Sequence, residues 1–170
     1  NGVRVAIPIP SAPGDVQGIF RVLTTGTRSL DGFSPIAHFV IETAEAVDPT
    51  TFPQTPAAAL EPGAAAGLFD VTEGSATFGR RIPFRADIRD DLSVIGVRSH
   101  SILAFPSIPL EPGGRYAFVV TNRVRSVSGR PLAPSAFFRA ALGPPLPDEA
   151  EVITRARALA TEAIAAAATH

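Results

Sequence analysis

Serine hydroxyls are the first candidates for chemistry in this sequence. A serine nucleophile of the α/β-hydrolase type stands in a Gly-x-Ser-x-Gly turn, because both glycines are needed for the sharp strand-to-helix geometry. Gly32 precedes Ser34, but no glycine follows at the required position, and Ser75 follows Gly74 without the rest of the pattern. We therefore expect both hydroxyls to bond nearby backbone groups in turns. The sequence predicts no catalytic residue in this chain.

Histidines are the second candidates, as general bases or as metal ligands. The chain has three, His38, His100 and His170, and no two of them stand at the spacing of a metal site. His38 lies next to Phe39 in a predicted strand, and His100 begins another. We expect imidazoles with ordinary hydrogen bonds and no metal centre.

An acidic cluster, Asp87, Asp90 and Asp91, is the third candidate. Carboxylate oxygens suit Ca²⁺, which some sandwich modules hold between loops. Arg85 and Arg89 are interleaved with these carboxylates, however, and this arrangement favours salt bridges. The sequence leaves calcium at this cluster open.

A phosphate-binding loop is not indicated. Gly63 and Gly67 belong to an Ala/Gly tract, and no lysine follows to meet a phosphate. The sequence predicts no cofactor.

Composition limits the class of protein. The chain has 170 residues, of which 45% are hydrophobic, and this fits one domain with extensions. The net charge is −1, so no basic face for nucleic acid is indicated, and there is no Cys for disulfides or thiolate metal sites. No apolar run is long enough to span a bilayer. Because the chain begins at Asn1, we expect a piece of a longer protein that is secreted or belongs to the cell envelope.

Seven short apolar segments separated by Pro/Gly turns predict strands. The Tyr116–Thr121 strand should place Tyr116, Phe118 and Val120 on a buried face and Val119 on the opposite face. The segments on either side of the turn at 73–79 should form a hairpin. This alternation of strand and turn predicts a mainly β fold, an antiparallel β-sandwich. The predicted strands are 2–8, 19–24, 36–42, 68–72, 81–88, 101–105 and 116–121.

Three stretches between the strands carry further expectations. Asp48-Pro49 predicts a helix of about one turn, with an aspartate cap and proline at its first position. The Ala-rich stretch from Ala57 to Ala66 is expected to be irregular. Beyond the turn at 128–131, Leu132, Phe137 and Phe138 are expected to return the chain to the core.

The last part of the chain predicts a helix. Residues 143–147 read as a stiff linker, and Asp148 with Glu151 resembles a capping box that opens a helix from 148 to about 168. Glu151 and Arg155 are spaced as an i,i+4 ion pair. An apolar stripe is predicted to dock against the sandwich and a following domain, and its interface residues are Val152, Ala156, Leu159, Ala163 and Ile164. The predicted organisation is therefore a sandwich at 1–142, a linker at 143–147 and a C-terminal helix at 148–170 that leads to a further domain.

Two blocks of the sequence resemble a known family. The first is Ser29-Leu30-Asp31-Gly32-Phe33-Ser34-Pro35 with Val47-Asp48-Pro49-Thr50-Thr51-Phe52, and the second runs from Leu110-Glu111-Pro112-Gly113 to Gly129-Arg130-Pro131-Leu132 and Pro134-Ser135. Together, over about 29–138, they resemble the N-terminal immunoglobulin-like accessory domain of bacterial extracellular lipases of the virulence-factor type. The second block also resembles immunoglobulin-like modules of bacterial surface proteins. Ser126 departs from the pattern, which usually has Asp there, so a weaker turn bond is expected.

This resemblance implies a non-catalytic accessory module of a secreted or envelope-associated bacterial hydrolase of the lipase or esterase type. The module would pack on the downstream catalytic domain and shape access to its cleft. That domain, beyond His170, would carry the catalytic residues. Two alternatives stay open, a cell-surface adhesion or spacer module with no enzyme attached, and a stand-alone binder of carbohydrate or Ca²⁺.

Overall fold

A computed structural model describes residues 34–94 and 97–168 of the chain, and the side chains of residues 91–99 are not described. The chain divides into two compact units, residues 1–37 and residues 38–170. The predicted strands at 2–8 and 19–24 lie outside the described residues, as does His170. The account that follows concerns residues 38–168 except where Ser34 is named.

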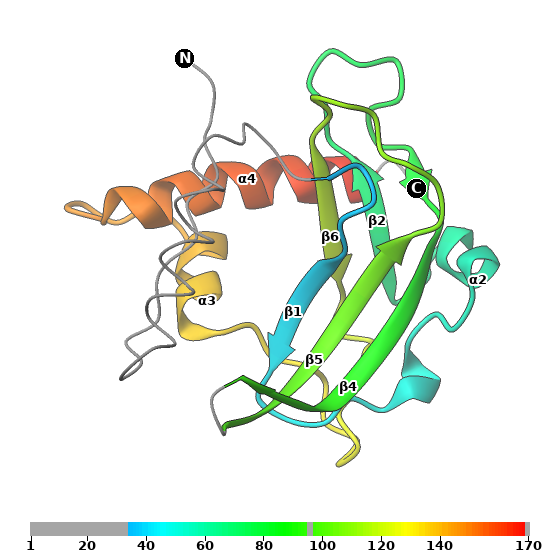
Figure 1. The fold of residues 1–170 in the computed structure, drawn as a ribbon. Helices are drawn as coiled ribbons and strands as arrows, with labels where there is room; N and C mark the ends of the chain where they lie inside the picture. The colour runs from blue at the N-terminus through cyan, green and yellow to red at the C-terminus, as the bar shows by residue number, and fades with distance from the viewer. Residues whose placement is uncertain (1–33, 95–96, 169–170) are drawn as a thin grey trace, which may run out of the picture. The chain divides into compact units, whose positions relative to one another are not determined.

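Two antiparallel sheets of three strands each form the body of the larger unit, and a long helix, α4, lies at its C-terminal end (Figure 1). The chain is therefore mixed in secondary structure. The sequence expectation of a β-rich body followed by a C-terminal helix is confirmed at this level. The first sheet has the order β1-β5-β4, with β1 at Phe39–Thr43, β4 at Phe84–Val94 and β5 at Val97–Pro106. The second sheet has the order β3-β2-β6, with β2 at Ala66–Asp70, β3 at Arg81–Ile82 and β6 at Tyr116–Val120.

The chain passes from one sheet to the other at Pro83. Before it, Ile82 pairs with Leu68 in the β2–β3 hairpin, as expected from the turn between them. After it, Phe84 pairs with Pro106 in the other sheet. A proline cannot donate a ladder hydrogen bond, so the strand expected over 81–88 is divided into β3 and β4 at this residue.

The main core lies between the two sheets. Leu68 and Ile82 come from one sheet and Phe84 and Ile102 from the other, and none of these side chains is more than 1% exposed. The ring of Phe118 stands 5.4 Å from that of Phe84, edge to face, a favourable arrangement for aromatic pairs.

The sequence correctly assigned the two faces of β6. Tyr116, Phe118 and Val120 pack against the main core, and Val119 packs in a second cluster on the other side of the sheet. The period of two along a strand explains this division.

Short helices fill two connections before β2. Residues Pro49–Thr51 form the expected turn, a 3₁₀-helix in which the Asp48 carboxylate accepts a 2.9 Å hydrogen bond from the N–H of Thr50. The expectation of an irregular stretch at 57–66 is wrong at both ends, because Pro56–Leu60 is helix α2 and β2 begins at Ala66, and it is confirmed for residues 61–65. Thr55 caps α2 through a 3.1 Å bond to the N–H of Ala58. The signal was a threonine cap with proline at the first helical position.

Helix α3, at Ala136–Leu142, was not expected from the sequence. The Ser135 hydroxyl caps it by accepting a 3.2 Å bond from the N–H of Phe138. Phe137 and Phe138 are 46% and 45% exposed, so the prediction that they return to the core is wrong. Neighbouring residues point about 100° apart on a helix, which leaves no single core position for both rings. Leu132, by contrast, packs against the core as expected.

The turn after Val124 contains Ser126. The family that the sequence resembles usually has an aspartate at this position. Its N–H donates to the carbonyl of Arg130 at 2.8 Å, and its hydroxyl lies 2.8 Å from that of Ser128. A carboxylate reaches the turn from another segment, because Glu45 accepts from Ser128 at 3.0 Å and from Arg130. Hydrogen bonds from Ser126, then Ser128, lower the pKa of Glu45.

Candidate functional site

Helix α4, Glu151–Ala168, carries the predicted interface residues. Its 18 residues span about 27 Å. The predicted capping box is wrong: Asp148 has a φ of 49°, and the first turn forms through the carbonyl of Ala150, which accepts from Ile153 at 2.8 Å. Asp148 therefore belongs to a turn before the helix, and α4 begins at Glu151.

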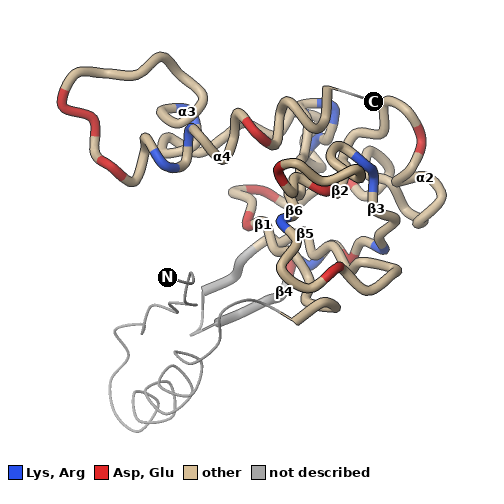
Figure 2. The backbone as a smooth tube through the Cα atoms, turned by 90° about the horizontal axis from the view of Figure 1, so that it is seen from above, with Lys and Arg blue, Asp and Glu red and all other residues tan. Residues whose placement is uncertain are grey.

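A polar hub joins α4 to α3. The guanidinium of Arg157 donates to the carbonyls of Ala140 at 2.8 Å and Gly143 at 2.9 Å, at the C-terminal end of α3. It also binds both carboxylate oxygens of Glu149, one of them at 2.6 Å. Cations are favourable at a helix C-terminus, where the last carbonyls lack partners. Arg157 thus fixes the connection between the helices, along which acidic positions gather (Figure 2).

Glu149 is held as a carboxylate in this hub. Hydrogen bonds from Arg157, the largest cause, lower its pKa to about 2. Its side chain is only 6% exposed. The pair expected between Glu151 and Arg155 is not among the ion pairs within 4.0 Å in the described part of the chain. The helix is tied to its neighbour by Arg157 instead, because that residue faces α3.

The C-terminal half of α4 packs on the outer face of the β3-β2-β6 sheet. Ala166 is fully buried against Phe69 and Val71, and Ala167 joins the same cluster. Arg115, beside β6, binds Glu162 of α4 at 2.5 Å. Part of the expected docking therefore takes place on the chain's own sheet.

The predicted interface residues divide into two groups. Val152, Leu159 and Ile164 are 60%, 51% and 53% exposed, whereas Ala156 and Ala163 are half-buried. The fully or nearly buried positions of α4 are instead Ala160 and Ala166. In Figure 1 the end of α4 near Ala168 crosses β6 and β2, and its beginning extends beyond them beside α3. Val152 lies in the part of α4 that extends beyond the sheet, whereas Ile164 lies beside the sheet and is exposed because it points to a different side of the helix from Ala166.

Helical geometry sets Ile164 apart from the other two large residues. Val152 and Leu159 are seven residues apart and lie on one side of the helix. Ile164 comes five residues after Leu159, about 140° further around the axis. The predicted stripe is therefore continuous for Val152, Ala156, Leu159 and Ala163, and Ile164 flanks it.

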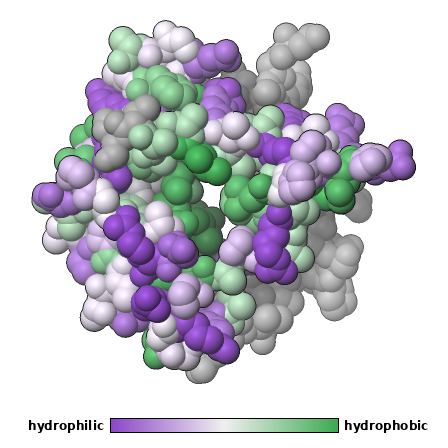
Figure 3. Space-filling view, turned by 180° about the vertical axis from the view of Figure 1, so that it is seen from behind, coloured by the Kyte–Doolittle hydropathy of each residue, from purple (hydrophilic) through white to green (hydrophobic). Residues whose placement is uncertain are grey.

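Helix α3 and the connection add further exposed apolar side chains to this region. Phe137, Phe138 and Leu142 on α3 and Leu146 on the connection are each at least 45% exposed. Figure 3 shows the molecule from behind the view of Figure 1, and on this face apolar surface surrounds a hollow. We name as the hairpin surface the exposed residues Phe137, Phe138, Leu142, Leu146, Val152 and Leu159. Sequence reasoning missed the α3 part, although a serine cap before two adjacent phenylalanines was visible.

The two candidate serines take part in turns, as expected. The Ser34 hydroxyl accepts from the N–H of Ile36 at 3.4 Å. The Ser75 hydroxyl accepts from the N–H of Thr77 at 3.1 Å. Neither serine forms a hydrogen bond with a histidine in the described part of the chain.

The described histidines and the acidic cluster make ordinary contacts. His38 lies 5.2 Å from the ring of Phe105, centroid to centroid, and His100 Nδ1 lies 3.2 Å from Asp90. Asp87 binds Arg89 at 2.8 Å, as the interleaved arginines suggested. Among the residues whose side chains are described, no group of three or more His, Cys, Asp or Glu could hold a metal ion. The side chain of Asp91 is not described, so calcium at this cluster stays open.

Comparison with protein-family models, with curated proteins and with solved structures finds no match to this chain. Within the described residues, no helix combines the length and the apolar character that crossing a bilayer requires.

Proposed function

We propose that this chain is a non-catalytic, immunoglobulin-like β-sandwich module of a secreted or envelope-associated bacterial hydrolase of the lipase or esterase type. Its role is to pack on a catalytic domain that follows in the same protein and to shape access to that domain's cleft. The proposed docking element is helix α4, Glu151–Ala168, which follows the two sheets and helix α3.

The β part of the proposal is supported by the arrangement of the two sheets. Both are antiparallel, and their facing side chains share one core. Sandwich modules are built in this way, with the chain changing sheet along its course. The change of sheet at Pro83 is of this kind.

The observation that carries the functional proposal is the exposure of large apolar side chains on a helix pair that is itself held firmly. Arg157 and Glu149 fix α3 against α4, so the hairpin surface stands on a defined scaffold. Clustered, exposed apolar side chains mark interaction sites in proteins. Helix α4 is the last described element and ends at Ala168 beside the β3-β2-β6 sheet, so a domain that follows it would have to extend back along α4 to cover the hairpin surface.

The test is to read the coding sequence beyond His170 and to assay both forms of the protein. The proposal expects a Gly-x-Ser-x-Gly elbow downstream. The 170-residue chain should hydrolyse short-chain p-nitrophenyl esters no faster than buffer, and the longer protein should hydrolyse them. Turnover by the 170-residue chain that disappears on replacing one serine or histidine would contradict the proposal. Repeated copies of this module without an elbow would assign it to a surface spacer or adhesion protein instead.

A matched pair of variants tests the interface itself. Leu159→Glu places a charge on the hairpin surface, and Ala158→Glu places the same charge on an exposed residue of the same helix outside it. In the longer protein, Leu159→Glu should reduce ester hydrolysis or weaken the contact between domains, and Ala158→Glu should leave both nearly unchanged. Equal effects of the two variants would contradict the proposed surface.

A further inference from the structure

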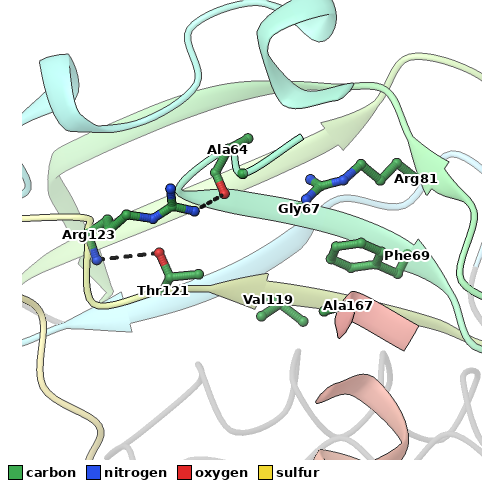
Figure 4. Close-up of a pocket in the computed structure, with 9 residues that line it drawn as sticks. Ala64, Gly67, Phe69, Arg81, Val119, Thr121, Arg123 and Ala167 are labelled. Atoms are coloured by element: carbon green, nitrogen blue, oxygen red, sulfur yellow. Dashed lines mark hydrogen bonds between the residues drawn. The ribbon is translucent and has the colours of Figure 1, made fainter. Parts of the chain in front are cut away.

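A hollow of about 160 Å³ opens on the outer face of the β3-β2-β6 sheet, beside the end of α4 (Figure 4). Apolar groups form much of its wall, among them Phe69 of β2, Val119 of β6 and Ala167 of α4. Two arginines, Arg81 and Arg123, complete it from different segments. The hollow is thus an apolar space that two cations border.

Both guanidinium groups are held in place before any ligand arrives. Arg81 lies over the ring of Phe69, 4.8 Å from its centroid, and donates to the carbonyl of Ala59 at 3.3 Å. Arg123 donates to the carbonyl of Ala64 at 3.0 Å. Each guanidinium makes one side-chain hydrogen bond in these contacts, although it has five N–H donors.

Charge at this place is not balanced. Within the described part of the chain, no carboxylate lies within 4.0 Å of either guanidinium. The Nε of Arg81 is buried and has no hydrogen-bond partner. Burial, then the like charge of Arg123, lowers the pKa of Arg81. Arg123 is exposed and Arg81 is half-buried, so the group that calls for an explanation, such as a bound ion, is the buried Nε of Arg81.

Glycine keeps the space open. A Cβ placed on Gly67 would lie 2.6 Å from the ring of Phe69 and 2.8 Å from Nη1 of Arg81. A larger residue there would displace both groups. Gly63, with a φ of 76°, borders the hollow next to Arg123.

In the described part of the chain, Arg81 and Arg123 form no hydrogen bond with the C-terminal end of α4. Cations near a helix C-terminus are favourable, and α4 ends at Ala168 beside the hollow. Yet the hydrogen bonds of Arg81 and Arg123 go to Ala59 and Ala64, and in the described part of the chain neither guanidinium binds a carbonyl of α4. A favourable interaction with the C-terminal end of α4 therefore does not account for the remaining N–H donors of Arg81 and Arg123.

We infer that the hollow binds a carboxylate on a short aliphatic stem, with the charge between Arg81 and Arg123 and the stem against Phe69, Val119 and Ala167. Guanidinium groups match the planar carboxylate with paired hydrogen bonds. Phosphate fits less well, because it has no aliphatic part to lie against Phe69, Val119 and Ala167. This inference is independent of the proposed function. The carboxylate can come from a free short-chain acid or from an acidic side chain of another polypeptide.

The test uses the ¹⁵N-labelled 170-residue chain and observes the arginine Nε–Hε signals by NMR. Sodium butyrate is the first probe, butyramide is its neutral isostere, and sodium chloride keeps the ionic strength constant. N-acetylglutamic acid α-amide represents an acidic side chain, and inorganic phosphate is the competing anion. We expect saturable shifts of the Arg81 and Arg123 signals with millimolar butyrate and none with butyramide. The tighter of the two carboxylates identifies the source.

Two variants with the same change of charge complete the test. Arg123→Gln removes one cation from the hollow and should weaken the butyrate response at Arg81 by about tenfold or more. Arg85→Gln, whose guanidinium lies over Phe105 in the other sheet, should leave it unchanged. No saturable shift with either carboxylate would overturn the inference, as would equal shifts with butyramide, a stronger response to phosphate, or an equal loss in both variants.

Discussion

The two faces of the β3-β2-β6 sheet are packed in different ways. On the inner face, Leu68 and Phe118 meet the large side chains of the other sheet. On the outer face, Phe69 and Val119 meet alanines of α4. Stabilisation by burial scales with apolar area, at about 25 cal/mol per Å². The inner contact should therefore account for most of the stability of this unit, and the outer contact for little.

This difference explains how α4 is attached. A helix of this length is marginal alone in water and depends on packing. Alanines allow close approach but bury little area, and polar contacts from Arg157 and Arg115 supply the rest of the attachment. The large apolar residues of α4 take no part in this attachment and stay exposed, so they can contact another surface. Four variants probe this comparison between the two faces.

Removing a ring from the inner face should have the largest effect. Phe84 is fully buried and contacts the rings of Phe52 and Phe118. Phe84→Ala should reduce the free energy of unfolding by about 3–5 kcal/mol, measured by urea denaturation. Phe78→Ala is the control, because Phe78 is 38% exposed, and it should cost clearly less, about 1–2 kcal/mol. A loss under about 1 kcal/mol at Phe84 would show that the core is not where this account places it.

Overfilling the outer face should have a smaller and more local effect. Ala166→Leu introduces a large side chain at a fully buried position against Phe69, with an expected cost of about 1–3 kcal/mol. Amide exchange should accelerate in α4 and stay nearly unchanged in β5. Ala165→Leu makes the same change at the neighbouring exposed position and should affect neither. Equal acceleration in both elements would mean that α4 and the core unfold as one unit.

The hub between the helices should give a pH-dependent effect. Its hydrogen bonds lower the pKa of Glu149 from 4.5 to about 2. A lowered pKa contributes stability that is fully present above the unfolded pKa and is lost as the pH falls. Exchange of the amides in α3 and the first turns of α4 should therefore increase as the pH falls from 4.5 toward 2, after correction for intrinsic rates. Glu149→Gln should make that region exchange faster at pH 7 and remove the pH dependence, whereas Glu151→Gln should preserve it.

The exposed ion pair should have the smallest effect. Glu162→Gln removes the partner of Arg115, and exposed pairs contribute about 0.2–1 kcal/mol. The loss should shrink at high salt, because screening weakens such pairs. A loss above about 2 kcal/mol, independent of salt, would show that polar contacts rather than alanine packing hold α4 to the sheet.

Patterns local in sequence predicted most of the described strands. Alternation predicted the two faces of β6, and turn residues predicted the β2–β3 hairpin. The change of sheet at Pro83 could not be read from the sequence, because it depends on which strand each half finds as its partner. The β4–β5 hairpin is longer than predicted, because β4 continues to Val94 and β5 begins at Val97, where the predicted strands ended at 88 and began at 101.

The candidate site was predicted in part. The helix at the C-terminus and its large apolar residues were recognised, but the buried residues of α4 are Ala160 and Ala166, of which Ala166 packs against the sheet. Which alanine faces the sheet depends on where α4 crosses it, and the sequence does not contain that information. The contact between Arg157 and Glu149 replaced the expected i,i+4 pair because it involves the C-terminal end of α3, a helix that was not expected.

Hydrogen exchange of the α4 amides over 152–164 tests the central claim most directly. The measurement compares the 170-residue chain with the protein extended beyond His170, under identical conditions. If the hairpin surface carries a following domain, these amides should exchange at least about tenfold more slowly in the longer protein, with β5 as an unaffected reference. Equal rates over 152–164 in the two proteins would contradict the claim that α4 is a docking element for that domain.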